Sequence, residues 1–418
     1  MSTPQLLFYV IVAILVINYL AEQYLEYLNA RHRSVELPKA LRGIYPEDEY
    51  KRSQKYKADN QKLSFISSTF NLLVILVFLF LDGFAWVDAW AREWSSHSLM
   101  TPLIFFAILM LAWDLLNIPF ALYDTFVIEE RYGFNKTTPR TFITDKIKGY
   151  LLSALLGGGL LLLVVWFYHQ TGALFWIFAW GLITAFTVFL TMFYTHWIVP
   201  LFNKLEPLGE GTLKNSIYDL CQRVGFKLRD VFVMDGSKRS TKGNAFFSGL
   251  GRKKRIVLFD TLIDELGVRE IQAVLAHEMG HYRKRHTLVN LMVSILQTGI
   301  TLFILSLLVN NPALSRALGV SEPSFHIALI AFSLLYSPIS MVLGIAMNFL
   351  SRKFEYQADA FAQYYGLSDD LISGLKKLSV KSLSNLTPHP AYVRVHYSHP
   401  PLLERIEHLQ GNQAEVQG

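Results

Sequence analysis

Long apolar stretches, separated by polar segments, dominate the pattern of residues along the chain. Seven of them approach or exceed the ~20 residues that a helix needs to cross a hydrocarbon layer about 30 Å thick. They are Leu6–Leu20, Phe65–Phe84, Leu103–Tyr123, Tyr150–Phe167, Phe175–Val199, Leu288–Val309 and Ile327–Leu350. The first has no basic residues before it and no small-residue cleavage site, so we interpret it as a retained span and not as a signal peptide. The pattern predicts a mainly α-helical, polytopic membrane protein with seven transmembrane helices.

The polar stretch between the fifth and sixth apolar segments has a different pattern. Thr212–Gly225 is predicted to be an amphipathic helix, and Arg229–Asp235 a short strand. Asn244–Ser248 and Arg255–Asp260 are two further strand-like runs, joined through Gly249 and Gly251 as in a hairpin. A good helix former then begins at Val268. These elements predict a soluble insert with a small β-sheet.

This organisation divides the chain into four parts. We expect residues 1–203 to hold transmembrane helices one to five, residues 204–286 the soluble insert, residues 287–350 helices six and seven, and residues 351–418 a polar helix followed by a C-terminal tail.

Composition supports a membrane protein. Of 418 residues, 52% are hydrophobic and only 17% are charged, a balance that soluble proteins of this size rarely have. The single cysteine, Cys221, excludes an intrachain disulfide and is expected to be a core thiol. The net charge is +6, but the basic residues gather beside the apolar stretches, so we expect no nucleic-acid partner.

The loops predict an orientation. Basic residues are frequent after the first and third spans, whereas the loops after the second and sixth spans carry only Arg92 and Arg316 and the loop after the fourth carries none. Because cytoplasmic loops are enriched in Lys and Arg, the N-terminus is expected outside and the C-terminus in the cytoplasm. Residues 204–286 and 352–418 then also lie in the cytoplasm.

The soluble insert ends in a candidate metal site. Residues 277–281 read His277-Glu278-Met279-Gly280-His281, the H-E-x-x-H pattern. Four residues turn a helix by about 400°, so both imidazoles share one face and can bind one zinc ion, with Glu278 beside it as general base. Gly280 weakens a helix, and a small residue here suits the close approach of a substrate or a packed neighbour. The alternative is a surface helix with two solvated histidines.

A catalytic zinc needs a third protein ligand. The metzincin pattern is excluded, because Lys284 and Thr287 stand where its glycine and third histidine would be, and His286 is one place short. We expect Glu355 to be the third ligand. Asp359 lies one turn later on the same helix face, where it could accept a hydrogen bond from a ligand histidine. The alternative for both acids is a charged helix face paired with neighbouring basic residues.

Two other functions remain open from the residues alone. A transporter or lipid-binding membrane protein with structural zinc would explain the spans, although structural zinc prefers four protein ligands and often thiolates. A general quality-control protease of the membrane would use the same zinc chemistry without a lipid requirement.

Several motifs beyond the zinc pattern are recognisable, and they extend over nearly the whole chain. They are Glu129-Glu130-Arg131-Tyr132-Gly133-Phe134-Asn135-Lys136, Phe202-Asn203-Lys204-Leu205, Ser237-Lys238-Arg239-Ser240 running to Asn244-Ala245-Phe246-Phe247, the Glu355–Asp359 pair, and Ser398-His399-Pro400-Pro401 with Glu404-Arg405. With these motifs the chain resembles the type I CAAX prenyl endopeptidases, integral-membrane zinc proteases of the gluzincin group.

The resemblance implies that His277, His281 and Glu355 bind one Zn²⁺ and that Glu278 is the general base. It implies that Asn244 and Ala245 lie along the substrate strand, and that His399 and Arg405 approach the site, His399 as a catalytic residue and Arg405 as a substrate-binding residue. It implies seven helices around an intramembrane chamber. The implied substrate is a peptide or protein, possibly prenylated at a C-terminal cysteine, that loses its last three residues. Membrane lipids are the other expected partner.

Two features led us to expect a bacterial family member in an inner (cell) membrane. The loop between the last two spans is short, and the C-terminus, Glu415-Val416-Gln417-Gly418, has no dilysine signal.

Overall fold

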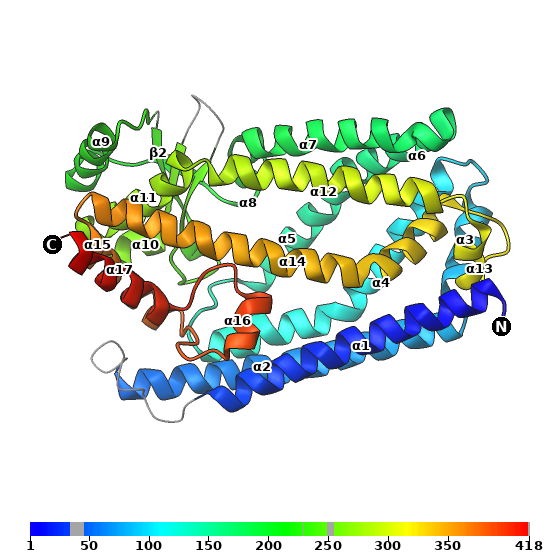
Figure 1. Ribbon diagram of the computed structural model, residues 1–418, viewed down its shortest axis with the longest axis horizontal. Coiled ribbons are helices and arrows are strands. Elements are labelled where there is room, and N and C mark those ends of the chain that lie inside the picture. Colours follow the sequence, from blue (N-terminus) through cyan, green and yellow to red (C-terminus); the bar gives the residue numbers. More distant parts are fainter. Residues whose placement is uncertain (34–45, 229, 249–254, 417–418) are drawn as a thin grey trace.

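The computed structural model describes residues 1–33, 46–228, 230–248 and 255–416 (Figure 1). Four expected features lie wholly or partly outside these ranges: the start of the strand predicted at Arg229, the hairpin turn through Gly249 and Gly251, the last two residues of the C-terminus, and part of the first basic loop.

Helices make up most of the described chain. Those of the apolar part are α1 (Thr3–His32), α2 (Glu47–Phe80), α3 (Gly83–Trp94), α4 (Met100–Tyr123), α5 (Pro139–Leu152), α6 (Gly159–Thr171), α7 (Phe175–Trp197), α8 (Val199–Phe202), α12 (His286–Leu308), α13 (Pro312–Ala317) and α14 (Phe325–Tyr364), with π-helical turns η2 (Asp124–Glu129) and η3 (Ser153–Gly158) and the 3₁₀ turn η4 (Gly172–Leu174). Those of the polar part are α9 (Thr212–Val224), η5 (Gly236–Lys238), α10 (Asp260–Glu265), α11 (Val268–Arg283), α15 (Ser368–Lys381), α16 (Pro390–His396) and α17 (Leu402–Val416).

Six helical stretches in the described chain are long and apolar enough to cross a membrane. One of them, Pro139–Phe202, has 64 residues and would be about 95 Å long if straight, far more than one crossing requires. It reverses at Gly172, whose φ of 55° is the left-handed conformation that glycine tolerates, and α7 then packs along α6. This stretch therefore contains both the fourth and the fifth predicted spans.

The bounds of two predicted spans can be compared with those of the helices. The second span was expected to reach Phe84, but α2 ends at Phe80, and Asp82 takes a left-handed conformation before α3 begins. The last predicted span, which ends at Leu350, and the polar helix expected after it form one helix, because α14 continues unbroken to Tyr364. Its polar end is therefore rigidly joined to its membrane part.

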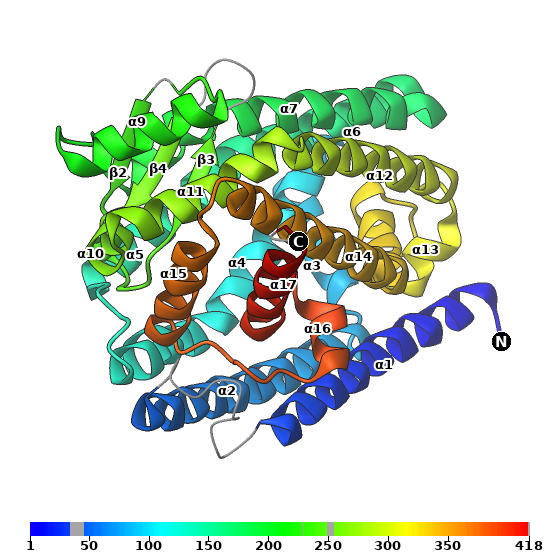
Figure 2. The same ribbon diagram turned by 60° about the vertical axis from the view of Figure 1, so that its left-hand side comes forward.

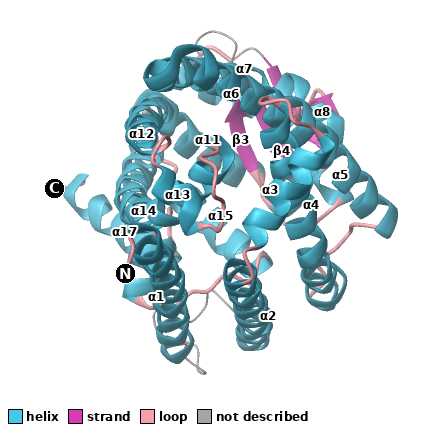
Figure 3. Ribbon diagram, turned by 90° about the vertical axis from the view of Figure 1, so that its right-hand side faces the viewer, coloured by secondary structure: helices cyan, strands magenta, loops and turns pink. Residues whose placement is uncertain are grey.

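The long helices form a closed ring. Each contacts the next in the order α1, α2, α4, α6, α7, α12, α14 and back to α1, and the ring is visible end-on in Figure 3. The chamber expected inside this ring stays a prediction.

The ring has two different ends. The N-terminus, α3 and α13 lie at one end, whereas the strands, α9, α11, α15 and α17 gather at the other (Figures 1 and 2). The first residues of α14 pack at the former end, and its last two turns reach the latter. This arrangement agrees with the alternation of loops predicted from the basic residues.

The soluble insert carries a mixed four-stranded sheet in the order β1-β2-β4-β3. Its strands are β1 (Leu205–Pro207), β2 (Asp230–Met234), β3 (Ala245–Ser248) and β4 (Arg255–Phe259). β2 and β4 are parallel, and β1 and β3 pair antiparallel to them. β1 was not predicted, because three residues that end in a proline carry no strand pattern. One side of the sheet packs on α9 and α11 through residues such as Ile256, Leu258, Ile271 and Leu275.

Charged pairs join the insert to the helix ring. Arg239, just after η5, forms a two-pronged pair with Asp145 of α5, with N–O distances of 2.7 and 2.9 Å. Lys242 binds Glu129 of η2 at 2.8 Å. A two-pronged guanidinium–carboxylate pair fixes orientation as well as distance, so these contacts hold the insert in a defined position against η2 and α5, the segment that connects α4 and α6 of the ring.

Candidate active site

The H-E-x-x-H residues lie on α11, whose start is well capped. The backbone N–H of Gly267 donates to Glu270 Oε2 at 2.7 Å, and the same carboxylate receives hydrogen bonds from Ser373 and Lys377 of α15. One face of α11 is fully buried through Ile271, Leu275 and Met279. The helix is thus fixed at its start and along its length, which sets the direction of the histidines that follow.

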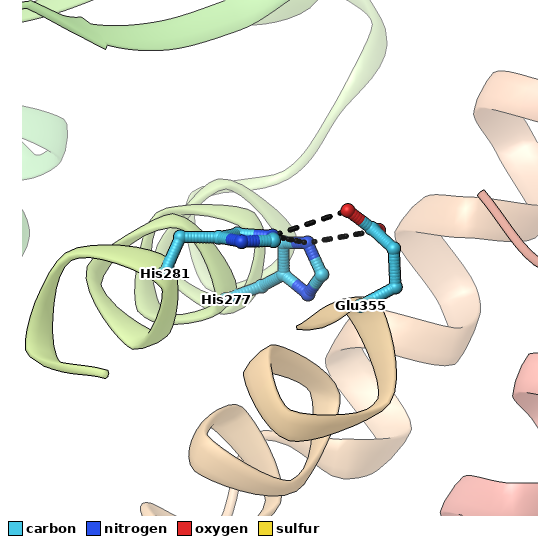
Figure 4. Close-up of side chains that lie close together, drawn as sticks. All are labelled: His277, His281 and Glu355. Carbon is cyan, nitrogen blue, oxygen red and sulfur yellow. Dashed lines mark hydrogen bonds and ion pairs between the residues drawn. The ribbon is translucent and has the colours of Figure 1, made fainter. Parts of the chain in front are cut away.

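His277, His281 and Glu355 converge on one point (Figure 4). The Nε2 atoms of the two histidines are 3.2 Å apart, and they lie 3.4 and 3.2 Å from the two oxygens of Glu355. Ligand atoms about 2.0–2.2 Å from a tetrahedral zinc would be separated by about 3.3–3.6 Å, so the spacing fits that metal.

The buried carboxylate also fits a metal ligand. Glu355 is 3% exposed, and its Oε2 atom accepts no hydrogen bond of acceptable geometry from any described residue, although the His399 Nδ1 atom lies 2.8 Å away. Two imidazole nitrogens and a carboxylate facing one another at this distance require a proton or a cation between them. His277, His281 and Glu355 could therefore hold one metal ion.

Gly280 explains how the two helices come so close. A Cβ atom at this position would lie 2.9 Å from Cβ of Phe361 and 3.0 Å from Cα of Ala358, both on α14. A small residue at this position suits either substrate approach or helix packing, and in the structure Gly280 packs against α14. This contact lets Glu355, on the preceding turn of α14, reach both histidines.

A buried pair supports His277 from behind. Its Nδ1 atom is 2.8 Å from Asp359 Oδ1, and Arg405 of α17 contacts both oxygens of Asp359 at 2.6 and 2.9 Å. Burial lowers the pKa of His277, but the carboxylates of Asp359 and Glu355 outweigh burial and raise this pKa to about 9. Burial likewise opposes charge on Arg405, yet Asp359 raises the pKa of its guanidinium. Arg405 is 8% exposed, and its guanidinium also lies 3.4 Å from Nδ1 of His277 and 3.7 Å from Oε2 of Glu355.

A further histidine beside His281 was given no role by the sequence. His286, the first residue of α12, is buried, stacks on Phe354 and contacts both His281 and Gln357. The only signal in the sequence is a third histidine shortly after the motif. His286 lies near His281 because Arg285 adopts a left-handed φ of 61°. This conformation is uncommon for an arginine and cannot be predicted from the sequence.

The two expected catalytic side chains, Glu278 and His399, are more exposed than the buried residues His277 and Glu355. Glu278 is half-buried and makes no hydrogen bond or ion pair with the described residues. His399 has 65% of its side chain exposed, although its ring reaches Glu355. Both therefore border the ligand group from accessible positions, where a bound molecule could meet them.

Asn244 and Ala245 stand at the free margin of the sheet. β3 is the last strand in the order, so within the described residues one of its edges has no partner strand. Asn244 is exposed, its side chain accepts from the N–H of Ala245 at 2.8 Å, and its carbonyl accepts from Phe259 of β4. An unpaired edge can bind an extended peptide by main-chain hydrogen bonds.

Comparison with known families divides the chain at the point where the insert begins. Residues 26–204 match the family model described as CAAX prenyl protease N-terminal, five membrane helices, and residues 207–413 match Peptidase family M48.

Curated relatives are similar over nearly their whole length. The CAAX prenyl protease 1 homolog of Oryza sativa is 35% identical over 96% of both chains. The homolog of Homo sapiens is 31% identical over 95% of this chain and 94% of its own, and CAAX prenyl protease 1 of Saccharomyces cerevisiae is 33% identical over 93% and 92%. The crystal structure of S. mikatae Ste24p superposes with a TM-score of 0.92 at 33% identity, over 96% of this chain and 99% of that one. These relatives are eukaryotic, and a bacterial origin of the present chain is not shown.

Proposed function

Because the chain belongs to the CAAX prenyl protease 1 family of membrane metallopeptidases, we propose that it uses one zinc ion to remove the C-terminal tripeptide from prenylated CAAX-type proteins. The observation that carries this proposal is the convergence of His277, His281 and Glu355 at zinc-ligand spacing. A zinc ion held there would supply Lewis acidity, which polarises a peptide carbonyl and makes a water molecule more acidic.

Side chains of the protein carry out proton transfer, stabilisation of the oxyanion and substrate binding. The Glu278 carboxylate takes the proton from the attacking water and passes it to the leaving amine. His399 donates a hydrogen bond to the oxygen that gains charge on the substrate carbonyl. The edge of β3, with Asn244 and Ala245, binds the substrate backbone as an added strand. Asp359 and Arg405 hold His277 in the orientation of a ligand.

The site faces the cytoplasm in this proposal, and the protein is a multi-pass component of a membrane. The basic loops and the gathering of the insert and C-terminus at one end of the ring support this orientation. An inner (cell) membrane of a bacterium stays a prediction.

The substrate is tested with two peptides that differ only in a farnesyl group on the cysteine of the same CAAX sequence. We expect the purified protein to release the last three residues, with a clearly higher kcat/KM for the farnesylated peptide, and to lose this activity to a chelator. Equal cleavage of both peptides would favour a general membrane protease. Cleavage of neither would contradict the proposed function.

Glu278→Gln separates metal binding from proton transfer. The amide cannot accept the proton, so we expect turnover to fall by roughly 10²–10⁴-fold or more while bound zinc stays equal to wild type. The matched control is Glu210→Gln, the same change at an exposed residue, which should keep full activity. Normal turnover by Glu278→Gln would remove Glu278 from the mechanism. Metal content by mass spectrometry and peptide cleavage are measured on the same preparations.

A further inference from the structure

His286 stands behind His281 much as Asp359 stands behind His277. Its Nδ1 atom is 3.0 Å from Nδ1 of His281, the ring nitrogen that points away from the ligand group. Its Nε2 atom is 2.8 Å from Oε1 of Gln357, on α14. The His286 ring is 2% exposed and lies flat on Phe354, with ring centroids 4.0 Å apart and planes within 7°.

The chemistry of these contacts fixes where the protons lie. An amide oxygen only accepts hydrogen bonds, so Nε2 of His286 carries the proton that it shares with Gln357. A neutral imidazole has one N–H, which leaves Nδ1 of His286 as an acceptor. The proton between the two Nδ1 atoms therefore belongs to His281. The Nε2 atom of His281 then keeps its lone pair, and this atom faces His277 and Glu355.

We propose that His286, held by Gln357, is a positioning residue that selects the metal-binding tautomer of His281. It touches neither metal nor substrate and acts through His281. The two ligand histidines thus have different supports: a carboxylate paired with an arginine for His277, and a neutral imidazole paired with an amide for His281.

Both supports come from one stretch of α14. Phe354 and Gln357 hold His286, while Glu355 is the ligand and Asp359 supports His277. The turn at Arg285 brings His286 back onto this stretch. These contacts set the orientation of the histidine rings before a metal binds. Loss of a hydrogen-bond partner of a ligand histidine typically weakens metal affinity 10–100-fold.

The test is the zinc dissociation constant of the full-length protein in detergent, measured without substrate by competition with a chelator. His286→Phe keeps the ring stacked on Phe354 but removes the acceptor, so we expect zinc to bind about 10–100-fold more weakly. His286→Asn removes the stacked ring but keeps an acceptor atom at the Nδ1 position, so its affinity should stay within about threefold of wild type. A role in packing alone predicts the opposite order, and that order would overturn the proposal.

Gln357 gives a second, independent pair of variants that leave His286 in place. Gln357→Leu removes the acceptor for Nε2 and should weaken zinc binding, whereas Gln357→Glu retains an acceptor and should not. Equal affinity of these two variants would overturn the proposal even if His286→Phe failed to fold. The inference rests on zinc binding as part of the proposed function: a wild-type protein that binds no zinc would overturn both, whereas zinc binding by wild type and His286→Phe alike would overturn this inference alone.

Discussion

Each ring nitrogen that faces away from the ligand group has a specific partner, and this feature is what distinguishes the site from a chance cluster of histidines. Asp359 takes Nδ1 of His277 and His286 takes Nδ1 of His281. With the Nδ1 atoms held in this way, the Nε2 atoms of both histidines face Glu355. The directions of the candidate ligand nitrogens are therefore set by neighbours that a bound metal would not touch.

The raised pKa of His277 predicts how metal binding depends on pH. Its pKa of about 9 means that the metal-free site carries a proton on His277 at neutral pH, and this proton must leave before the ring can bind a metal. The apparent zinc affinity should therefore rise about tenfold per pH unit below pH 9 and level off above it. Competition titrations between pH 6 and 9.5, corrected for chelator protonation, measure this slope. An affinity independent of pH across the range would contradict the assignment.

Most of this site could be predicted from residues, but not all of it. The spacing of His277 and His281 follows from helix geometry, and the pair Glu355 and Asp359 stands out one turn apart. His286 could not be placed, because its position depends on a left-handed Arg285 between two helices, which the sequence does not reveal. Nor does the sequence show that Arg405 is buried and paired with Asp359 instead of lying open to substrate.

At the scale of elements, the close contact of α11 with α14 builds the site. Gly280 removes the side chain that would separate them, and the surrounding residues of both helices are buried. The pattern of apolar residues predicted each helix but not their contact. The apolar pattern ends at Leu350 and does not show that the polar helix with Glu355 is continuous with the last span.

Gly280→Ala tests this contact. The added methyl group meets backbone atoms of Ala358, so one helix must shift, at a cost of about 1–3 kcal/mol. We expect lower thermal stability, weaker zinc binding and lower turnover together. Gly344→Ala, on α14 with open space around its Cβ position, is the matched control and should leave all three unchanged. Wild-type zinc affinity in Gly280→Ala would show that the packing does not set the ligand distances.

At the scale of the whole molecule, directed charged contacts add to helix packing in joining the insert to the long helices. Arg239 with Asp145 and Lys242 with Glu129 fix the insert to the end of the ring at which the site lies. The sequence predicted the spans and the insert. It did not predict the order of helices around the ring, because contacts between apolar faces depend on shape and not on pattern.

The orientation predicts which engineered thiols a membrane-impermeant maleimide reaches. The native Cys221 is 3% exposed, and burial raises its pKa to about 12, so it provides a silent background. In intact spheroplasts of a bacterial host, Ser96→Cys, between α3 and α4, should be labelled. Asn215→Cys, on the exposed side of α9, should be labelled only after permeabilisation. The reverse result would place the site on the other side of the membrane.

The most direct measurement is a zinc titration of chelator-stripped protein, with bound metal and cleavage of the farnesylated peptide followed in the same sample. Activity should be absent at the start, rise in proportion to bound zinc and level off at one ion per chain, while Glu355→Gln should neither bind zinc tightly nor recover activity. Full activity of the stripped protein, or tight zinc binding without Glu355, would contradict the account.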